Sequence, residues 1–554
     1  MTTGSRPSKN WPAVVWVSLL ALAGGGVVLA SIINLTQQDF RLSGTQMGGV
    51  DQVRFRSSTN CRICHGDFDP VSAPYDAWAG SLMAQAGRDP LFMAQMTNAN
   101  QDVANVGTFC MRCHVPMSYV SGHALPPDGS ALDARDLDGV TCHLCHSMVD
   151  PIYQPGVSPP EDLPILTALG VTPQYYANAQ FVLDPRGTRR GPLADAQPPH
   201  EFIYSPFHRT ANMCGTCHEV GNVAVSRRPD GTYLYNAVDQ ATPSENPAHQ
   251  FPLERTFSEW RLSAFANGGV DMHGRFNGEG PTVVSTCQDC HMPKVSGPVC
   301  AGGEPRTRVA RHEFAGGAAQ VLDLIAEFTR EDPSVDQDAI AEGRRRSVSM
   351  LQRAASLEVS GGDGRLNVRV VNETGHKLPT GHIEGRRVWI NVMFLDAADN
   401  IVLEHGAYDA GTAELDEHST VVYEMLVGLS PEAAVITGLP AGVTGRMSLA
   451  NTIEKDNRIP PRGFRNAEFE AAGAPVVGAA YADGQYWDDR PFLIPRRAVR
   501  AVVRLLYQNT PRHYIESLRN GNVTDNRGEV LYNLWEATGK GKPCLLYTSD
   551  AADE

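Results

Sequence analysis

Hydrophobic and polar positions divide the sequence into stretches of different character, and the first is a long apolar run. It extends from Trp11 to Leu35 without a charge and follows Arg6 and Lys9. About 20 apolar residues are enough to span a bilayer, and the flanking cations stay in the cytoplasm. The run predicts an N-terminal transmembrane helix within residues 1–35, which anchors the chain on the periplasmic side of the inner membrane. A cleaved signal segment that releases a soluble exported protein is the alternative, because residues 28–30 resemble a processing site.

Residues 51–317 form a second stretch, rich in Gly, Pro, Asn and Asp, with short helical patterns and long loops. Continuous apolar runs are few here, so the core has to come from something else. The pattern predicts a mainly α and irregular domain. Residues 318–356 then indicate a helical connector, in which Val348, Leu351 and Ala355 recur at helical spacing.

Residues 357–543 change to alternating apolar and polar positions, which is typical of strands. The alternation is clear at 366–370 and 388–392, and 401–403 and 498–507 are further strand candidates. Together with the turns between them, these predict an all-β domain of the immunoglobulin-like sandwich type.

The end of the chain adds two closing helices and a tail. Helical patterns occupy residues 514–518 and 530–537. The last eleven residues, 544–554, match nothing before them and are predicted to be a non-native tail outside the fold.

A weak internal repeat links two helical patterns in the second stretch. Residues 75–84 and 257–266 share the order Trp-x-x-Ser-x-x-Ala, and each lies upstream of a pair of cysteines. Met83 in the first copy corresponds to Phe265 in the second. Coincidence between two amphipathic helices is the alternative interpretation.

Composition narrows the class of protein. Hydrophobic residues make up 42% and charged residues 20%, as in ordinary globular proteins. Acidic residues outnumber basic ones, 62 to 47, which gives a net charge of −15. A nucleic-acid partner is therefore not expected, because no basic surplus exists to neutralise phosphates.

Ten of the twelve cysteines fall into five Cys-x-x-Cys-His motifs, the pattern of c-type haem attachment. Two thiols bond the vinyl groups of the porphyrin, and the adjacent His becomes the proximal iron ligand. Zinc sites and disulfides are the alternatives, but neither requires a His after every second Cys. Five covalent haems are thus predicted on Cys61, Cys64, Cys110, Cys113, Cys142, Cys145, Cys214, Cys217, Cys287 and Cys290, with proximal His65, His114, His146, His218 and His291.

The opposite side of each iron needs a distal ligand if all five irons are six-coordinate. Twelve of the 17 histidines remain after the proximal ones are removed. For each of them, a solvated or hydrogen-bonded side chain is the plainer interpretation. The distal candidates are His208, His312, His376, His143, His123 and His382, with the sulfur of Met83 as a further option.

At this point the sequence resembles the multihaem cytochrome c superfamily, which includes the tetrahaem cytochrome of ammonia oxidisers, hydroxylamine oxidoreductase and octahaem tetrathionate reductase. The five motifs and residues 205–218 and 311–317 carry the resemblance over about 51–317. Residues 376–389, 456–464 and 505–508 resemble the C-terminal part of an uncharacterised branch. The resemblance implies haems stacked in pairs with mostly bis-His ligation.

The expected function is electron transfer: an exported, membrane-anchored pentahaem c-type cytochrome that relays electrons in a respiratory chain. Other cytochromes or a quinol-linked membrane complex are the expected partners. The alternative is a periplasmic multihaem oxidoreductase that acts on a small nitrogen or sulfur oxyanion at one open iron. The positions of Met83 and Phe265, where relatives carry a His, are where such an iron would be sought.

Overall fold

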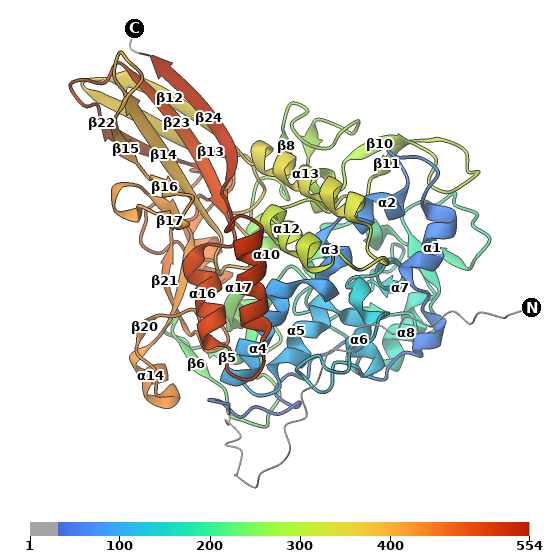
Figure 1. Cartoon of the computed structure of the whole chain (residues 1–554). Helices are drawn as coiled ribbons and strands as arrows, with labels where there is room; N and C mark the ends of the chain where they lie inside the picture. The colour runs from blue at the N-terminus through green and yellow to red at the C-terminus, as the bar shows by residue number, and fades with distance from the viewer. Residues whose placement is uncertain (1–30, 553–554) are drawn as a thin grey trace, which may run out of the picture. The chain divides into compact units, whose positions relative to one another are not determined.

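The computed structural model describes residues 31–552, and its first half mixes short helices, small sheets and long loops, whereas the sequence pattern predicts a mainly α and irregular domain (Figure 1). Among the described residues before residue 300, the longest helix is α4, with 13 residues. The helices are α1 (Ser58–His65), α2 (Pro74–Ala79), α3 (Leu82–Gln85), α4 (Pro90–Asp102), α5 (Val106–His114), α6 (Pro116–Ser121), α7 (Cys142–Ser147), α8 (Asp162–Ala168), α9 (Ala211–Gly215), α10 (Thr256–Arg261) and α11 (Cys287–His291).

Small two- and three-stranded sheets connect these helices. Four are pairs: β1 (Met148–Val149) with β2 (Val182–Leu183), β3 (Arg189–Gly191) with β4 (Phe202–Tyr204), β8 (Val270–Asp271) with β9 (Val283–Val284), and β10 (Lys294–Gly297) with β11 (Arg306–Ala310). In the fifth, β5 (Val220–Arg227) lies between β6 (Tyr233–Tyr235) and β7 (Gln250–Glu254).

The predicted helical connector is confirmed as two helices, α12 (Ala319–Phe328) and α13 (Gln337–Arg353). Asp336 caps α13 by accepting a hydrogen bond from the backbone N–H of Ala339. Two glycines let α13 approach the end of α2 backbone to backbone. A Cβ atom on Gly343 would lie 1.7 Å from the carbonyl oxygen of Gly80.

The predicted strands of the C-terminal part are confirmed. One sheet has the order β15 (Ile401–His405), β14 (Arg387–Leu395), β23 (Arg500–Gln508) and β24 (Cys544–Ala552), with β18 (Val422–Tyr423) also paired to β14. A second has the order β12 (Ala355–Gly362), β13 (Arg365–Asn372) and β22 (Trp487–Leu493). Their inward-facing residues form one core, which includes Val368, Ile390, Val392, Val503 and Leu505.

The prediction of an all-β sandwich is wrong, because helices and further small sheets are mixed into this part. One small sheet consists of β16 (Tyr408–Asp409) and β17 (Glu414–Leu415). In another, β19 (Met425–Leu429) lies between β20 (Gly442–Val443) and β21 (Thr452–Asp456). The helices are α14 (Pro431–Thr437), α15 (Asn466–Ala471), α16 (Arg512–Gly521) and α17 (Arg527–Ala537).

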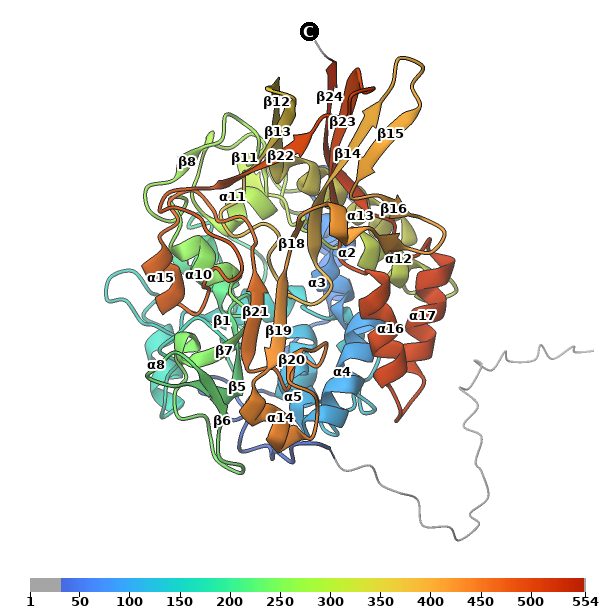
Figure 2. The ribbon, with the colours of Figure 1, turned by 90° about the vertical axis from the view of Figure 1, so that its left-hand side faces the viewer.

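The physical reason for this mixing is that α16 and α17 have apolar faces that the sheets do not cover. Ile515 of α16 and Trp535 of α17 are buried with Leu91 and Ala94 of α4, near the start of the chain. Figure 2 shows the two C-terminal helices beside α4. Residues from Ser31 onward accordingly form one compact unit.

The predicted N-terminal transmembrane helix also needs correction. Within the described residues, no helix is long and apolar enough to cross a membrane. Residues 31–35, the end of the predicted span, are not helical: Ile33 pairs with Val103 as an isolated parallel bridge, and Leu35 is buried beside Phe40 and Phe109. The rest of the predicted span, residues 1–30, lies outside the described part of the chain.

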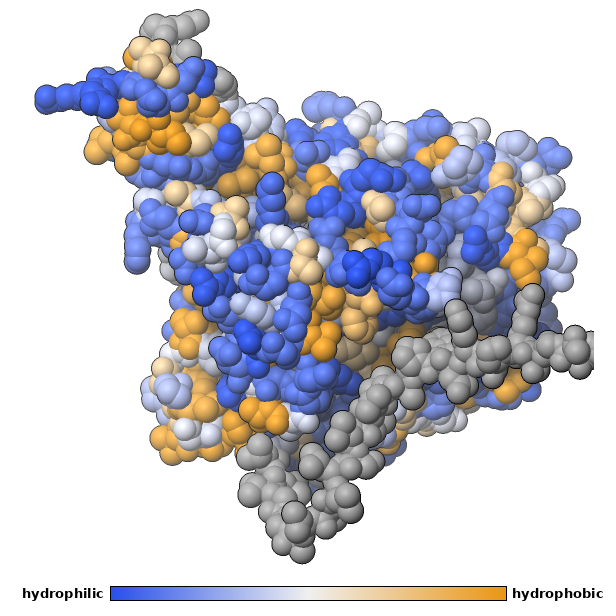
Figure 3. Space-filling model, viewed as in Figure 1, coloured by the Kyte–Doolittle hydropathy of each residue, from blue (hydrophilic) through white to orange (hydrophobic). Residues whose placement is uncertain are grey.

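The C-terminal tail is paired with the fold rather than separate from it. Residues Cys544–Ala552 form β24, which runs antiparallel to β23. The sheets carry exposed apolar side chains at Ile401, Leu403, Leu493 and Leu545. Figure 3 shows a hydrophobic patch over this end of the molecule and a mostly hydrophilic surface elsewhere on that face.

The contact between α13 and α2 predicts an unusual response to Gly343→Ala. The substitution stabilises an ordinary helix interior by about 0.5–1 kcal/mol. Here the added methyl group meets the Gly80 carbonyl, so we expect a loss of about 1–3 kcal/mol in the free energy of unfolding. Urea unfolding measures it, with the exposed Ser349→Ala on the same helix as the control. A more stable Gly343→Ala protein would contradict the contact.

Candidate haem sites

Each Cys-x-x-Cys-His motif lies at a short helix, which brings its two thiols and its imidazole to one side of a single turn. Helices α1, α5 and α11 end at the motif histidine, and α7 ends one residue later. The fourth helix, α9, ends at Gly215, inside its motif. Thr141 and Thr286 cap the third and fifth motif helices through side-chain hydrogen bonds to the backbone. Local capping thus fixes where these motifs begin.

The five motifs meet in one continuous cluster. The thiols of Cys61 and Cys142 lie beside each other, and the interaction with Cys142 lowers the pKa of Cys61 to about 7. A thiol–thiol interaction of the same kind joins Cys113 of the second motif to the fourth motif and lowers the pKa of Cys113. Another joins Cys214 of the fourth motif to the fifth motif and lowers the pKa of Cys214. Burial raises the pKa of Cys145 to about 12, and nearby Cys214 adds to the shift. The order in space is therefore first, third, fourth and fifth, with the second beside the fourth.

Four of the five motif imidazoles are oriented by a hydrogen bond from Nδ1, which leaves Nε2 for a metal. The Nδ1 atoms of His65, His146 and His291 donate to the backbone oxygens of Val299 (2.8 Å), Arg190 (2.7 Å) and Ala315 (2.6 Å). That of His218 donates to the carboxylate of Glu254 at 3.1 Å. Metal-bound histidines make this kind of outer hydrogen bond almost invariably. The motif residues therefore fit the proximal side of a c-type haem.

The zinc and disulfide alternatives fit less well. All ten motif cysteines are free thiols. Among the described residues, one cluster of side chains that can bind metals has spacing suited to a metal ion. It consists of His123, Asp133 and Asp136 and contains no cysteine.

His312 and His208 lie beside the third motif histidine. Their ring centroids are 6.2 Å and 5.7 Å from that of His146, and the rings are close to parallel. His312 donates its Nδ1 hydrogen to the oxygen of Ala310. His208 donates from Nε2 to Cys145, while its Nδ1 is buried with no hydrogen-bond partner among the described residues. Each ring thus keeps one nitrogen for a ligand, and the orphaned Nδ1 indicates a group that the protein chain does not supply.

His376 and His382 reach two other motifs from the C-terminal half of the chain. Burial lowers the pKa of His291 to about 4, and nearby His376 adds to the shift. Burial likewise lowers the pKa of His382 to about 4; nearby Arg386 adds to the shift, Glu254 opposes it, and His114 also lies near the ring. Neutral imidazole is the form that binds a metal. The loop from His376 to His382 therefore supplies ligand candidates to the fifth and second motifs.

The remaining distal candidates have other partners. His143 accepts a hydrogen bond at Nδ1 from Arg56 and donates from Nε2 to Gly187, so both ring nitrogens are engaged. His123 donates from Nδ1 to Asp136 at 2.7 Å. For Met83, the carbonyl oxygen accepts from Val140, which places α3 just before the third motif. Distal ligation by any candidate stays a prediction.

The internal repeat has a structural counterpart. The indole N–H of Trp78 donates to the oxygen of Val140, and that of Trp260 donates to the oxygen of Ser285. Each acceptor lies two residues before the first Cys of its motif. The two helices therefore hold the third and fifth motifs in equivalent ways, and coincidence does not account for the match.

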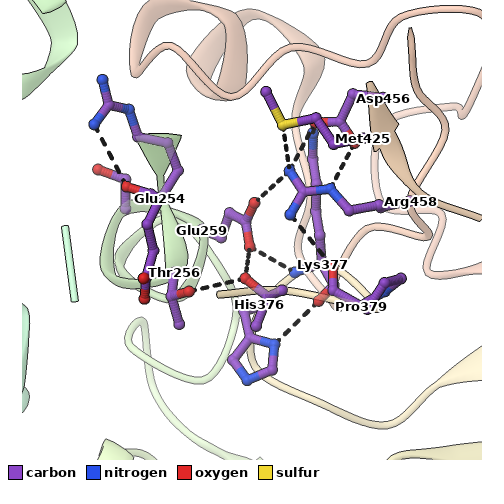
Figure 4. A network of polar contacts seen from close by, with 12 residues as sticks. Glu254, Thr256, Glu259, His376, Lys377, Pro379, Met425, Asp456 and Arg458 are labelled. Atoms are coloured by element: carbon purple, nitrogen blue, oxygen red, sulfur yellow. Dashed lines mark hydrogen bonds and ion pairs between the residues drawn. The ribbon is translucent and has the colours of Figure 1, made fainter. Parts of the chain in front are cut away.

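A buried ionic network ties the loop that carries His376 to α10 (Figure 4). Glu259 accepts from the backbone N–H of Lys377 at 3.1 Å and pairs with Arg458 at 3.0 Å. Asp456 pairs with both Lys377 and Arg458 at 2.7 Å. All four side chains are at most 5% exposed. No local pattern singles out Glu259, because its partners Lys377 and Arg458 lie more than 100 residues away along the chain.

Comparisons with known proteins give one structural likeness. Neither a protein-family model nor a curated protein matches the sequence. The crystal structure of a penta-heme cytochrome c552 from Thermochromatium tepidum aligns with a TM-score of 0.49 and 17% sequence identity, over 90% of this chain and 100% of that chain. A likeness this distant assigns no function, so the haem assignment depends on the motifs and their geometry.

The buried network predicts a large loss of stability when one partner is removed. Lys377→Met leaves Asp456 with one cation instead of two, and a broken buried pair typically costs about 3–5 kcal/mol. The matched control is Arg519→Met, which breaks the exposed pair with Glu529 and should cost under about 1 kcal/mol. Denaturant unfolding measures both, and equal losses would contradict the assigned role.

Proposed function

We propose that this chain is a pentahaem c-type cytochrome that carries electrons between redox partners. The observation that carries the proposal is the continuous cluster of the five motifs, in which thiols of neighbouring motifs lie beside one another. Electron tunnelling slows steeply with distance, so an electron carrier needs its centres this close together.

The chain's own residues would hold each centre. The ten motif cysteines would bond the porphyrins covalently, and the five motif histidines would bind the irons. When bound, a c-type haem supplies an iron that takes up and releases one electron. His208 or His312, His376 and His382 would close the opposite sides of three irons, because each lies near a motif histidine.

Two arginines that could hold a small oxyanion are already paired with carboxylates, which supports a carrier over an enzyme. An enzyme would need free cations beside an open iron. Arg387 pairs with Glu417 at 2.6 Å and donates to Gln508. Arg306 pairs with Asp195 at 2.9 Å.

The net charge of the chain indicates the class of redox partner that it would bind. With a net charge of −15, the chain suits a redox protein that docks through a basic face. Another cytochrome or a quinol-linked complex would meet that requirement. Export to the periplasmic side is part of the proposal and depends on the sequence pattern at the start of the chain.

The proposal requires a distal ligand on the other two irons as well, and so predicts that no iron is open. The absorption spectra of the oxidised and reduced haem-loaded protein, and the electron paramagnetic resonance spectrum of the oxidised protein, should show low-spin haem only. Added nitrite or cyanide should leave them unchanged. One high-spin signal that responds to the added ligand would instead establish the alternative, an oxidoreductase with a substrate-binding iron.

A further inference from the structure

One motif histidine differs from the other oriented three in the charge of its hydrogen-bond partner. His65, His146 and His291 donate from Nδ1 to neutral backbone carbonyls. His218 donates to a carboxylate, that of Glu254. The fourth motif is also the one whose cysteines contact or neighbour those of the second, third and fifth motifs.

Sheet register holds Glu254 in this position. β5 begins two residues after His218, and Glu254 at the end of β7 pairs with Val220, the first residue of β5. The adjacent residues, Glu219 and Arg255, form a buried ion pair at 3.3 Å across the same two strands. The Glu254 side chain is 16% exposed, so water screens its charge weakly.

We infer that Glu254 is a positioning and tuning residue that lowers the midpoint potential of the haem carried by Cys214 and Cys217. The inference rests on the proposed electron-transfer function. A carboxylate that accepts the Nδ1 hydrogen fixes the ring and makes the imidazole a stronger electron donor to its metal. A stronger donor and a nearby negative charge both favour the oxidised iron, whereas a neutral carbonyl gives less of either effect.

The central position of the fourth motif affects the path that electrons take through the cluster. The fourth motif is the meeting point of the cluster, so a lowered potential there keeps electrons from resting at the junction. The electrons then reside mainly on the haems of the outer motifs, where redox partners can reach them. Cys64 of the first motif is the one exposed cysteine among the described residues, which makes that motif an outer site.

The test is a spectroelectrochemical titration of the haem-loaded, full-length protein and of Glu254→Gln. The amide oxygen still accepts the Nδ1 hydrogen, so ring orientation is kept while the charge is removed. One of the five midpoint potentials should rise and the other four should stay. Glu432→Gln is the matched control: it removes the same charge from a surface pair with Arg228 and should move none. Glu254→Asp keeps the charge and should give a smaller rise.

The outcomes separate this inference from the proposed function. Five unchanged potentials in Glu254→Gln, or a fall, would overturn the role of Glu254 while the electron carrier stands. Loss of haem from Glu254→Gln together with unchanged potentials in Glu254→Asp would show a structural role only and would also overturn it. If the haems of the unsubstituted protein did not reduce reversibly, both the role of Glu254 and the proposed electron transfer would be overturned.

Discussion

Five Cys-x-x-Cys-His turns from distant parts of the chain have to meet in one place, and the remaining structure is arranged around that requirement. Within the described residues, the first half has no helix longer than 13 residues and no sheet of more than three strands, so regular elements alone do not place the motifs. Thiol contacts between motifs, indole hydrogen bonds from Trp78 and Trp260, and Nδ1 hydrogen bonds from the motif histidines define the cluster instead. Haem attachment would fill that cluster with large apolar groups.

The C-terminal half serves the same cluster. Its two main sheets have their own apolar core, yet the loop from His376 to His382 reaches the motifs, and α16 and α17 pack on α4. The buried network of Glu259, Lys377, Asp456 and Arg458 holds that loop in register with α10. Buried charges of this kind add little net stability but make alternative arrangements costly. The network thus favours one position for the loop.

Local patterns in the sequence predict the motifs, the strands at 366–370 and 388–392, and helices α16 and α17, because spacing and alternation are local properties. The all-β sandwich fails because alternation does not reveal where the apolar faces of Ile515 and Trp535 will pack. The transmembrane helix fails at its described end because hydropathy does not distinguish a bilayer from the protein interior around Leu35. Glu254 and Glu259 could not be singled out at all, because sheet register and tertiary pairing place them.

The central claim is that the five motifs hold five covalent haems in one cluster. The most direct measurement is the intact mass and haem content of the full-length protein, produced in a host that attaches c-type haem. The mass should exceed that of the bare chain by five haems, and the increase should persist under denaturing conditions. A chain without covalent haem, with its motif cysteines bound to zinc or joined as disulfides, would contradict it.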